Sequence, residues 1–237
     1  MIRIELQVDL NYEIDAGGAD FAFNVHAANT PNQTISAEQL TLNQPLLQRM
    51  YTDPATGNRY MYVHAEPGDL RLSYSATIDL MHHFVDPAQI AEIPIRDLPP
   101  EVMGYIFPSR YCQSDRLIKL ASSEFGALPQ GYGRVLAIRD WVQQRVTFTA
   151  NSSNSNTSAV DTLIEQVGVC RDFAHLMIAL CRAVNIPARF TTGTDYGADP
   201  ALGPSDFHAY VEVYLGNRWY ILAIFAQSPE KVKISEC

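Results

Sequence analysis

Cysteine is scarce in this chain of 237 residues, which has only Cys112, Cys170, Cys181 and Cys237. Their irregular spacing fits neither a zinc-binding pattern nor a disulfide framework, so we expect no metal and no other cofactor. The amino terminus reads as an alternating strand rather than as a secretion signal. We therefore expect reduced thiols and a cytoplasmic location.

Positive charge is also in short supply, because 17 Lys and Arg face 26 Asp and Glu, for a formal charge of −9. This balance argues against nucleic acid or an anionic membrane surface as the main partner. The chain also lacks an apolar run of membrane-spanning length. Its 47% hydrophobic content is ample for a compact core, and nothing in it indicates an oligomeric state.

Strict alternation of apolar and polar residues marks the first ninety or so residues. It runs through Ile2–Ile14 and again through Leu70–Leu80, which predicts strands with one buried face. The turn-rich segments Thr52–Asn58 and Glu66–Asp69 are predicted to join hairpin strands. We expect an N-terminal antiparallel β-sandwich over residues 1–92.

The rest of the chain, residues 93–237, changes to helical patterns followed by strands, which is typical of an α+β fold. The proline-rich stretch Glu92–Val102 is interpreted as a linker. Ser114, and Thr157 or Ser158, are candidate helix caps. The predicted elements are helices over Asp115–Phe125, Gly133–Arg145, Ala159–Glu165 and the segment after Cys170, then strands over Ala188–Thr194, Phe207–Leu215 and Trp219–Phe225.

The stretch "GVCRDFAHLMIALCRAVNIP", Gly168–Pro187, predicts a helix that is apolar almost all the way round and therefore lies centrally. Cys170 stands at its amino end, where the helix dipole favours an anion and lowers the pKa of a thiol. The alternative is that Cys170 is a small buried core residue, as most unpaired cysteines are.

A nucleophilic cysteine needs a base within hydrogen-bonding reach. His175 lies five residues along the same helix and points about 140° away from Cys170, which favours a structural role. His208, in "DFHAYVEVY", shares one strand face with Tyr210 and Glu212. A strand packed on the Cys170 helix could present His208 to the thiol, although it could equally be an ordinary strand histidine.

These motifs resemble the transglutaminase-like superfamily, whose core is shared with papain-like thiol enzymes. The resemblance is carried by "SAVDTLIEQVGVCRDFAHLMIALCRAVNIPARF" and then "DFHAYVEVYLGNRWY". "FPSRYCQSD" and the β-rich half resemble the N-terminal region of a bacterial branch. The resemblance implies a papain-like domain with a central helix packed on an antiparallel sheet, Cys170 as nucleophile, His208 as its partner, and a peptide or protein substrate.

One position departs from the family pattern. The family's third catalytic residue is an aspartate on the strand after the histidine strand, and in "RWYILAIFA" the matching residue is Ala223. The family also continues further, so the resemblance implies a shortened carboxyl end. The expected function is a thioester-forming cysteine peptidase or amidase of doubtful activity. A protein-glutamine amine transferase and a non-catalytic peptide- or protein-binding module remain as alternatives.

Other residues could supply what Ala223 cannot. Asp172, Asp206 and Glu212 are candidate substitutes for the acid, although each could instead be an ordinary structural or solvated carboxylate. Asn151 is a weak candidate for a second oxyanion donor. The polar loop Asn151–Ser158 is predicted to lie at the rim of the substrate groove.

Overall fold

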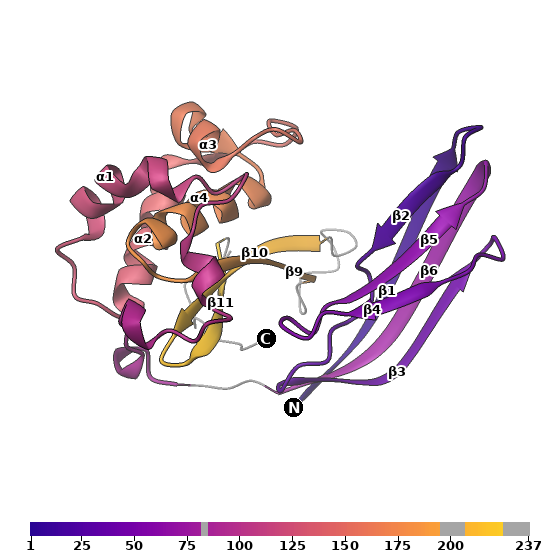
Figure 1. The fold of residues 1–237 in the computed structure, drawn as a ribbon, viewed down its shortest axis with the longest axis horizontal. Coiled ribbons are helices and arrows are strands. Elements are labelled where there is room, and N and C mark those ends of the chain that lie inside the picture. The colour runs from indigo at the N-terminus through magenta and orange to yellow at the C-terminus, as the bar shows by residue number, and fades with distance from the viewer. Residues whose placement is uncertain (82–84, 195–206, 225–237) are drawn as a thin grey trace. The chain divides into compact units, whose positions relative to one another are not determined.

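The computed structural model describes residues 1–81, 85–194 and 207–224. The chain forms two compact units, which divide after residue 82. In the described residues the first unit is built of strands, whereas the second combines helices with a sheet (Figure 1). The domain boundary expected after residue 92 stays a prediction.

The first unit contains two three-stranded antiparallel sheets, with strand orders β1-β6-β3 and β2-β5-β4. One hydrophobic core holds residues of both sheets, among them Val8, Met61 and Tyr74. The strands are β1 (Ile2–Ile14), β2 (Ala19–Phe23), β3 (Gln33–Leu42), β4 (Arg49–Thr52), β5 (Arg59–Ala65) and β6 (Gly68–Leu80).

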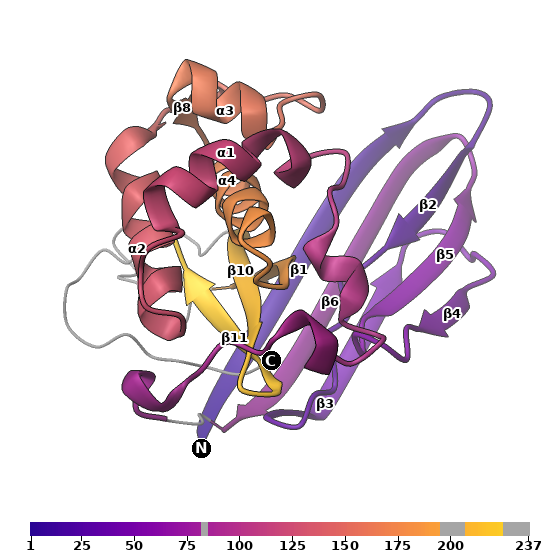
Figure 2. The same cartoon turned by 60° about the vertical axis from the view of Figure 1, so that its left-hand side comes forward.

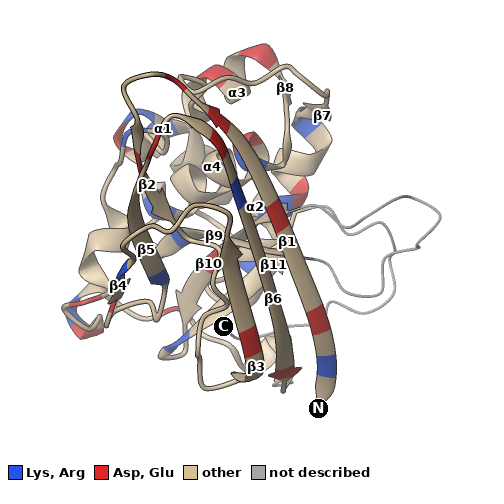
Figure 3. Ribbon diagram, turned by 90° about the vertical axis from the view of Figure 1, so that its right-hand side faces the viewer, with Lys and Arg blue, Asp and Glu red and all other residues tan. Residues whose placement is uncertain are grey.

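The two long alternating segments of the sequence pair with each other. Strands β1 and β6 run antiparallel in unbroken register from Ile2 opposite Leu80 to Ile14 opposite Gly68. Leu72 is 1% exposed, while the odd-numbered positions of β1 face solvent. Figure 3 shows charged positions recurring along β1 between uncharged ones. The period of two therefore identified the buried face correctly.

The two turn-rich segments behave differently. Thr52–Asn58 joins β4 to β5 as a hairpin turn, with Gly57 at φ 73° and the Asp53 amide donating to the Asn58 carbonyl at 2.8 Å. Glu66–Asp69 does not form a hairpin, because β5 and β6 belong to different sheets. The prediction for this second segment was wrong, since the chain crosses between sheets there to keep both strands on the shared core.

The second unit surrounds one central helix. Its helices are α1 (Ser114–Phe125), α2 (Tyr132–Arg145), α3 (Ala159–Glu165) and α4 (Cys170–Ala183). Short 3₁₀ turns cover Pro87–Gln89, Ile95–Asp97 and Met103–Ile106. The strands are β7 (Thr147–Phe148) and β8 (Val167–Gly168), which pair in parallel, and β9 (Ala188–Thr194), β10 (Phe207–Leu215) and β11 (Arg218–Ala223), which form an antiparallel sheet in the order β11-β10-β9.

Helix α4 is the buried centre of this unit. Every residue from Asp172 to Arg182 is buried, and α1, α2, α3, β9 and β10 all contact the helix (Figure 2). Val211 and Val213 of β10 are fully buried in the same core. The expected arrangement, a nearly all-apolar helix packed on an antiparallel sheet, is therefore confirmed.

The predicted helix caps are confirmed at α3 but not at α1. Ser158 precedes α3, and the Asp161 carboxylate accepts from the Ser158 amide at 2.9 Å, as a capping residue at the third helical position does. Ser114 is not a cap, because α1 already includes it and Gln113 takes the cap position. Gly216 and Asn217, with φ of 51° and 66°, form the tight turn expected between β10 and β11.

The stretch Glu92–Val102 is not a linker. Leu98 and Val102 are buried against Tyr214 of β10, and the Glu92 carboxylate pairs with the buried Arg134 guanidinium of α2. Its prolines break regular structure without preventing side chains on either side from packing. The segment is part of the second unit.

Candidate active site

Cys170 is the first residue of α4, directly after the short strand β8 and the cap residue Val169. The residue is partly exposed, whereas the helix behind it is buried. At this position the positive end of the helix dipole meets the thiol and favours an anion. Sequence and structure agree on this placement.

The other described cysteines lack this access. Cys112 and Cys181 are buried, and burial raises the pKa of Cys112 and raises that of Cys181 to about 12. Such thiols are protonated at neutral pH and are poor nucleophiles. Cys237 lies outside the described residues. Among the cysteines that the structure describes, Cys170 is thus the one that combines exposure with a helix amino terminus.

Strand β9 returns along α4 towards Cys170. Near the carboxyl end of the helix, the Arg182 Nε donates to the Ala188 carbonyl at 2.9 Å. One and a half to two turns earlier, the His175 ring lies 5.3 Å from the Phe190 ring. Helix α4 and strand β9 therefore run antiparallel, so the end of β9 lies level with the amino end of α4.

His208 is the second residue of β10, near the start of that strand. Strand β10 is antiparallel to β9 and pairs His208 with Gly193. Since β9 ends at Thr194, His208 lies level with the amino end of α4, where Cys170 stands. Alternation puts the His208 side chain on the face of β10 that also carries Tyr210 and Glu212.

Ala223, which the sequence predicts to stand where the family has its aspartate, is the last residue of β11. It pairs with Tyr210 across β10 and β11, and cross-strand partners project to the same face of a sheet. Ala223 therefore shares the face of His208 and is its diagonal neighbour. The residue is exposed, and its methyl group can neither accept a hydrogen bond nor carry charge.

Asp172 is directed to the turn before Cys170 and to the polar loop. One carboxylate oxygen accepts from the Val169 amide at 2.9 Å, and the other accepts from the Ser153 hydroxyl at 2.8 Å. Arg171 adds a bond from its Nη2 to the Asn154 carbonyl at 2.6 Å. The loop therefore lies beside the head of α4, as expected, and its role at the rim of a groove stays a prediction.

Asn151 is the exposed first residue of this loop, with φ of 63° in the left-handed region. Asparagine tolerates this conformation better than most residues. Its role as an oxyanion donor stays a prediction. Ser153 and Arg171 were not predicted from the sequence. Asp172 was the available signal, because a carboxylate at the third position of a helix indicates capping.

His175 and Glu212, both considered in the sequence analysis, are buried residues with structural contacts. His175 is 7% exposed and stacks on Tyr111 with ring centres 5.1 Å apart, and desolvation lowers its pKa to about 4. Glu212 is 2% exposed and its Oε2 pairs with the Arg189 Nε at 2.5 Å. Glu212 lies four positions along the strand from His208, about 13 Å away, which is too far for a direct hydrogen bond. Asp206 lies outside the described residues.

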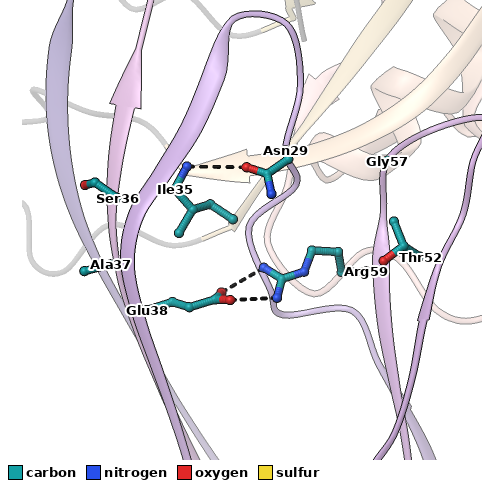
Figure 4. Close-up of a pocket in the computed structure, with 8 residues that line it drawn as sticks. All are labelled: Asn29, Ile35, Ser36, Ala37, Glu38, Thr52, Gly57 and Arg59. Atoms are coloured by element: carbon teal, nitrogen blue, oxygen red, sulfur yellow. Dashed lines mark hydrogen bonds and ion pairs between the residues drawn. The ribbon is translucent and has the colours of Figure 1, made fainter.

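A separate hollow of about 440 Å³ opens in the first unit (Figure 4). Its two charged residues, Arg59 and Glu38, form a two-bond ion pair of 2.7 and 2.8 Å that also lowers the pKa of Glu38. The pair neutralises both charges. The lining residues are Asn29, Ile35, Ser36, Ala37, Glu38, Thr52, Gly57 and Arg59.

The part of the chain that the structure describes offers neither a metal site nor a membrane-spanning helix. Within the described ranges, no group of three or more His, Cys, Asp or Glu side chains could hold a metal ion. None of the helices that the structure describes is both long and apolar enough to cross a membrane.

The chain is similar to known proteins over both units. Residues 119–224 match the transglutaminase-like superfamily, and residues 2–101 match the N-terminal domain of bacterial transglutaminases. The crystal structure of a "putative cysteine protease" from Cytophaga hutchinsonii is 38% identical, with a TM-score of 0.86 over 98% of this chain and 82% of that one.

A second relative gives a shorter match. An uncharacterized protein of Mycobacterium leprae is 28% identical over 89 residues, which are 36% of this chain and 32% of that protein. The match thus spans about a third of this curated relative. Together with the cysteine helix, the histidine strand and the N-terminal strands, the two family matches and the Cytophaga hutchinsonii structure show that this chain belongs to the transglutaminase-like superfamily.

Proposed function

We propose that this chain carries a thiol acyl-transfer site, with Cys170 as nucleophile and His208 as general acid and base. The observation that supports it most strongly is the placement of a partly exposed cysteine at the head of a buried helix, level with His208 on the adjoining sheet. Val211 and Val213 fill the interface with α4, and alternation puts His208 on the other face of β10, so the imidazole would have to reach the thiol around the amino end of the helix.

The chemistry of such a pair has two halves. The Cys170 thiolate attacks an amide carbonyl of a peptide or protein, and the leaving amine takes a proton from the His208 imidazolium as the thioester forms. Water then attacks the thioester and loses its proton to His208, and the acid leaves as the Cys170 thiolate and the His208 imidazolium are restored. This reaction is that of a peptidase or amidase, whereas an amine in place of water makes the site a protein-glutamine amine transferase.

Ala223 argues for low turnover. In thiol enzymes of this kind an acid fixes the imidazole in one orientation and stabilises its cation. The methyl group of Ala223 does neither, and its exposure leaves the place open to solvent. This observation favours the second candidate, a peptide- or protein-binding module that has kept the fold and lost the chemistry. A cytoplasmic location stays a prediction for either function.

The test is to supply the missing carboxylate. Ala223→Asp should raise the hydrolysis of a peptide amide, or the incorporation of a fluorescent amine into a glutamine-containing protein, by roughly 10²-fold or more. Ala223→Asn is the matched control, because an amide is similar in shape but cannot stabilise the imidazolium. Cys170→Ser should abolish both reactions.

High turnover in the unaltered chain would support the thiol site but show that the acid is dispensable, against the low turnover expected from Ala223. No turnover in Ala223→Asp, together with a Cys170 that alkylates no faster than Cys112 near pH 6, would favour the binding module over a thiol enzyme.

A further inference from the structure

The Asp172 carboxylate is fully buried, with no exposed side-chain surface. A buried carboxylate is stable only when its oxygens are hydrogen-bonded or paired with a cation. Its nearest cation, the Arg171 guanidinium, is 3.4 Å away and about one-third exposed. The shorter bonds come from the Val169 amide at 2.9 Å and the Ser153 hydroxyl at 2.8 Å.

The two oxygens of Asp172 have separate tasks. Oδ2 holds the backbone directly before Cys170 through the Val169 amide. Oδ1 holds the polar loop through Ser153, and Ser153 also accepts from the Arg171 Nη2 at 2.6 Å. One carboxylate therefore joins the turn that aims Cys170 to the loop that lies beside it.

Gly168 shows how closely this carboxylate and the turn fit. A Cβ added at Gly168 would lie 2.8 Å from the Asp172 Cβ and 3.1 Å from its Oδ2. Real carbon atoms do not approach so closely without displacement, so the turn before Cys170 packs directly on Asp172. A rotation of this turn would break the Val169 bond and leave a buried carboxylate oxygen without a partner.

We propose that Asp172 is a positioning residue for Cys170, and that it acts through the Val169 amide and the Ser153 loop rather than by replacing the acid missing at position 223. It fixes the direction of the thiol at the head of α4, where the positive end of the helix dipole favours a thiolate. The role of Cys170 as a nucleophile rests on the proposed function. The hydrogen bonds of Asp172 to Val169 and Ser153, which we call the Asp172 clamp, do not.

Asp161 provides a matched control. It occupies the same third position in its helix, α3, and accepts from the Ser158 amide at 2.9 Å and the Ser158 hydroxyl at 2.6 Å. Asp161 thus performs the capping half of what Asp172 does, on a helix that does not begin with the cysteine. Loss of a cap alone is reproduced by Asp161→Ala.

The first measurement is the pH profile of Cys170 alkylation by iodoacetamide, followed by peptide mass spectrometry in the full-length chain. Asp172→Ala should slow the reaction near pH 6 by roughly tenfold or more, because the turn loses its anchor. Asp172→Asn should recover most of the rate, since its amide oxygen can still accept from Val169. Asp161→Ala should leave the profile unchanged.

The second measurement is hydrogen exchange in the peptides that contain Ser153 and Val169, which needs no activity. Asp172→Ala should raise exchange in both peptides at least about tenfold while Asp161→Ala does not. If the unaltered Cys170 reacts no faster than Cys112, the proposed function fails. Hydrogen exchange alone then decides whether Asp172 holds the Val169 turn and the Ser153 loop together.

Three results would overturn the inference. One is unchanged exchange in Asp172→Ala. A second is equal effects of Asp172→Ala and Asp161→Ala on alkylation. The third is faster exchange with an unaltered alkylation profile in a chain whose Cys170 is reactive, because Asp172 would then stabilise the fold without positioning the thiol.

Discussion

The two units handle polar groups in opposite ways. In the residues that the structure describes, every buried polar or charged side chain belongs to the second unit: Ser114, Arg134, Thr157, Ser158, Thr162, Asp172, His175, Arg182 and Glu212. The first unit fills its core with apolar side chains and the Tyr74 ring. Its charges recur along the outer face of β1 (Figure 3).

The difference follows from the elements themselves. A half-buried strand has a wet face for its polar residues, whereas α4 is enclosed on all sides and has none. A buried polar residue of the second unit is therefore stabilised mainly by internal partners, as Asp172 is by Val169 and Ser153 beside Cys170. The first unit can change its surface charges freely, while the second cannot change its internal ones.

The largest test of this comparison is Glu92→Ala. The Glu92 carboxylate accepts from the Arg134 Nε at 2.8 Å and the Gly131 amide at 2.9 Å, and Arg134 is only 6% exposed. Removal leaves a buried cation unpaired, which should lower the free energy of unfolding of the second unit by about 3–5 kcal/mol. Both tryptophans, Trp141 and Trp219, lie in this unit, so urea unfolding followed by tryptophan fluorescence reports on it.

The control is an ion pair of the first unit. Arg3 and Asp79 pair at 2.8 Å, but Arg3 is 61% exposed, and Asp79→Ala should leave unfolding unchanged when it is followed by far-ultraviolet circular dichroism. The double variant Glu92→Leu with Arg134→Met should recover much of the loss. Equal losses for Glu92→Ala and Asp79→Ala would remove the distinction between the units.

The second test uses the pH dependence of stability. The pKa of His175 is lowered from 6.5 to about 4, by desolvation first and then by Arg171, with Asp172 opposing. Between these pH values the unfolded chain binds a proton at His175 that the folded chain does not. Stability should therefore fall as the pH drops below about 6.5, and this contribution should level off below about 4.

The measurement is urea unfolding by tryptophan fluorescence at several pH values. The contribution of His175 should be about 2–3 kcal/mol, read as the difference from His175→Phe, which can still stack on Tyr111. His64→Gln is the control in the first unit, because the His64 side chain is 57% exposed and bonds to Asp20. A fall of the same size in His175→Phe would place its origin elsewhere.

The smallest test concerns partly exposed carboxylates, where the two units should behave alike. Asp161 caps α3, and Asp53 orders the β4–β5 turn by accepting from the Ala55 amide at 3.0 Å and the Thr56 hydroxyl at 2.7 Å. Replacing either with alanine should lower the free energy of unfolding of its own unit by about 1 kcal/mol. A much larger loss for one of them, in denaturant titrations, would show that burial is not what separates the units.

Local pattern predicted most of the fold. Alternation located β1 and β6 and their buried faces, and helical periodicity located α2 and α3 to within one residue at each end. These features depend on neighbours in the sequence, so they can be read without knowing the tertiary structure. The crossing at Glu66–Asp69 was missed, because turn residues do not reveal whether the next strand joins the same sheet.

The candidate site was predictable only in part. The positions of Cys170 and His208 follow from a motif, but the contact of Asp172 with Ser153 spans 19 residues, and that of Glu92 with Arg134 spans 42. Such pairs form because folding buries both partners together, and no spacing in the sequence announces them. The prolines around Glu92 predicted a linker, because the sequence does not reveal that Glu92 has a buried partner in Arg134.

The long register between β1 and β6 has a consequence for the timing of synthesis. Ile2 has its partner in Leu80, so β1 cannot complete this pairing until the chain has grown past residue 80. At about 5–20 residues per second, translation takes on the order of 4–16 s to pass from Ile2 to Leu80. The first strand is thus exposed as a nascent segment throughout that interval, and its alternating charges, beginning with Arg3 and Glu5, discourage it from joining the strands of neighbouring chains.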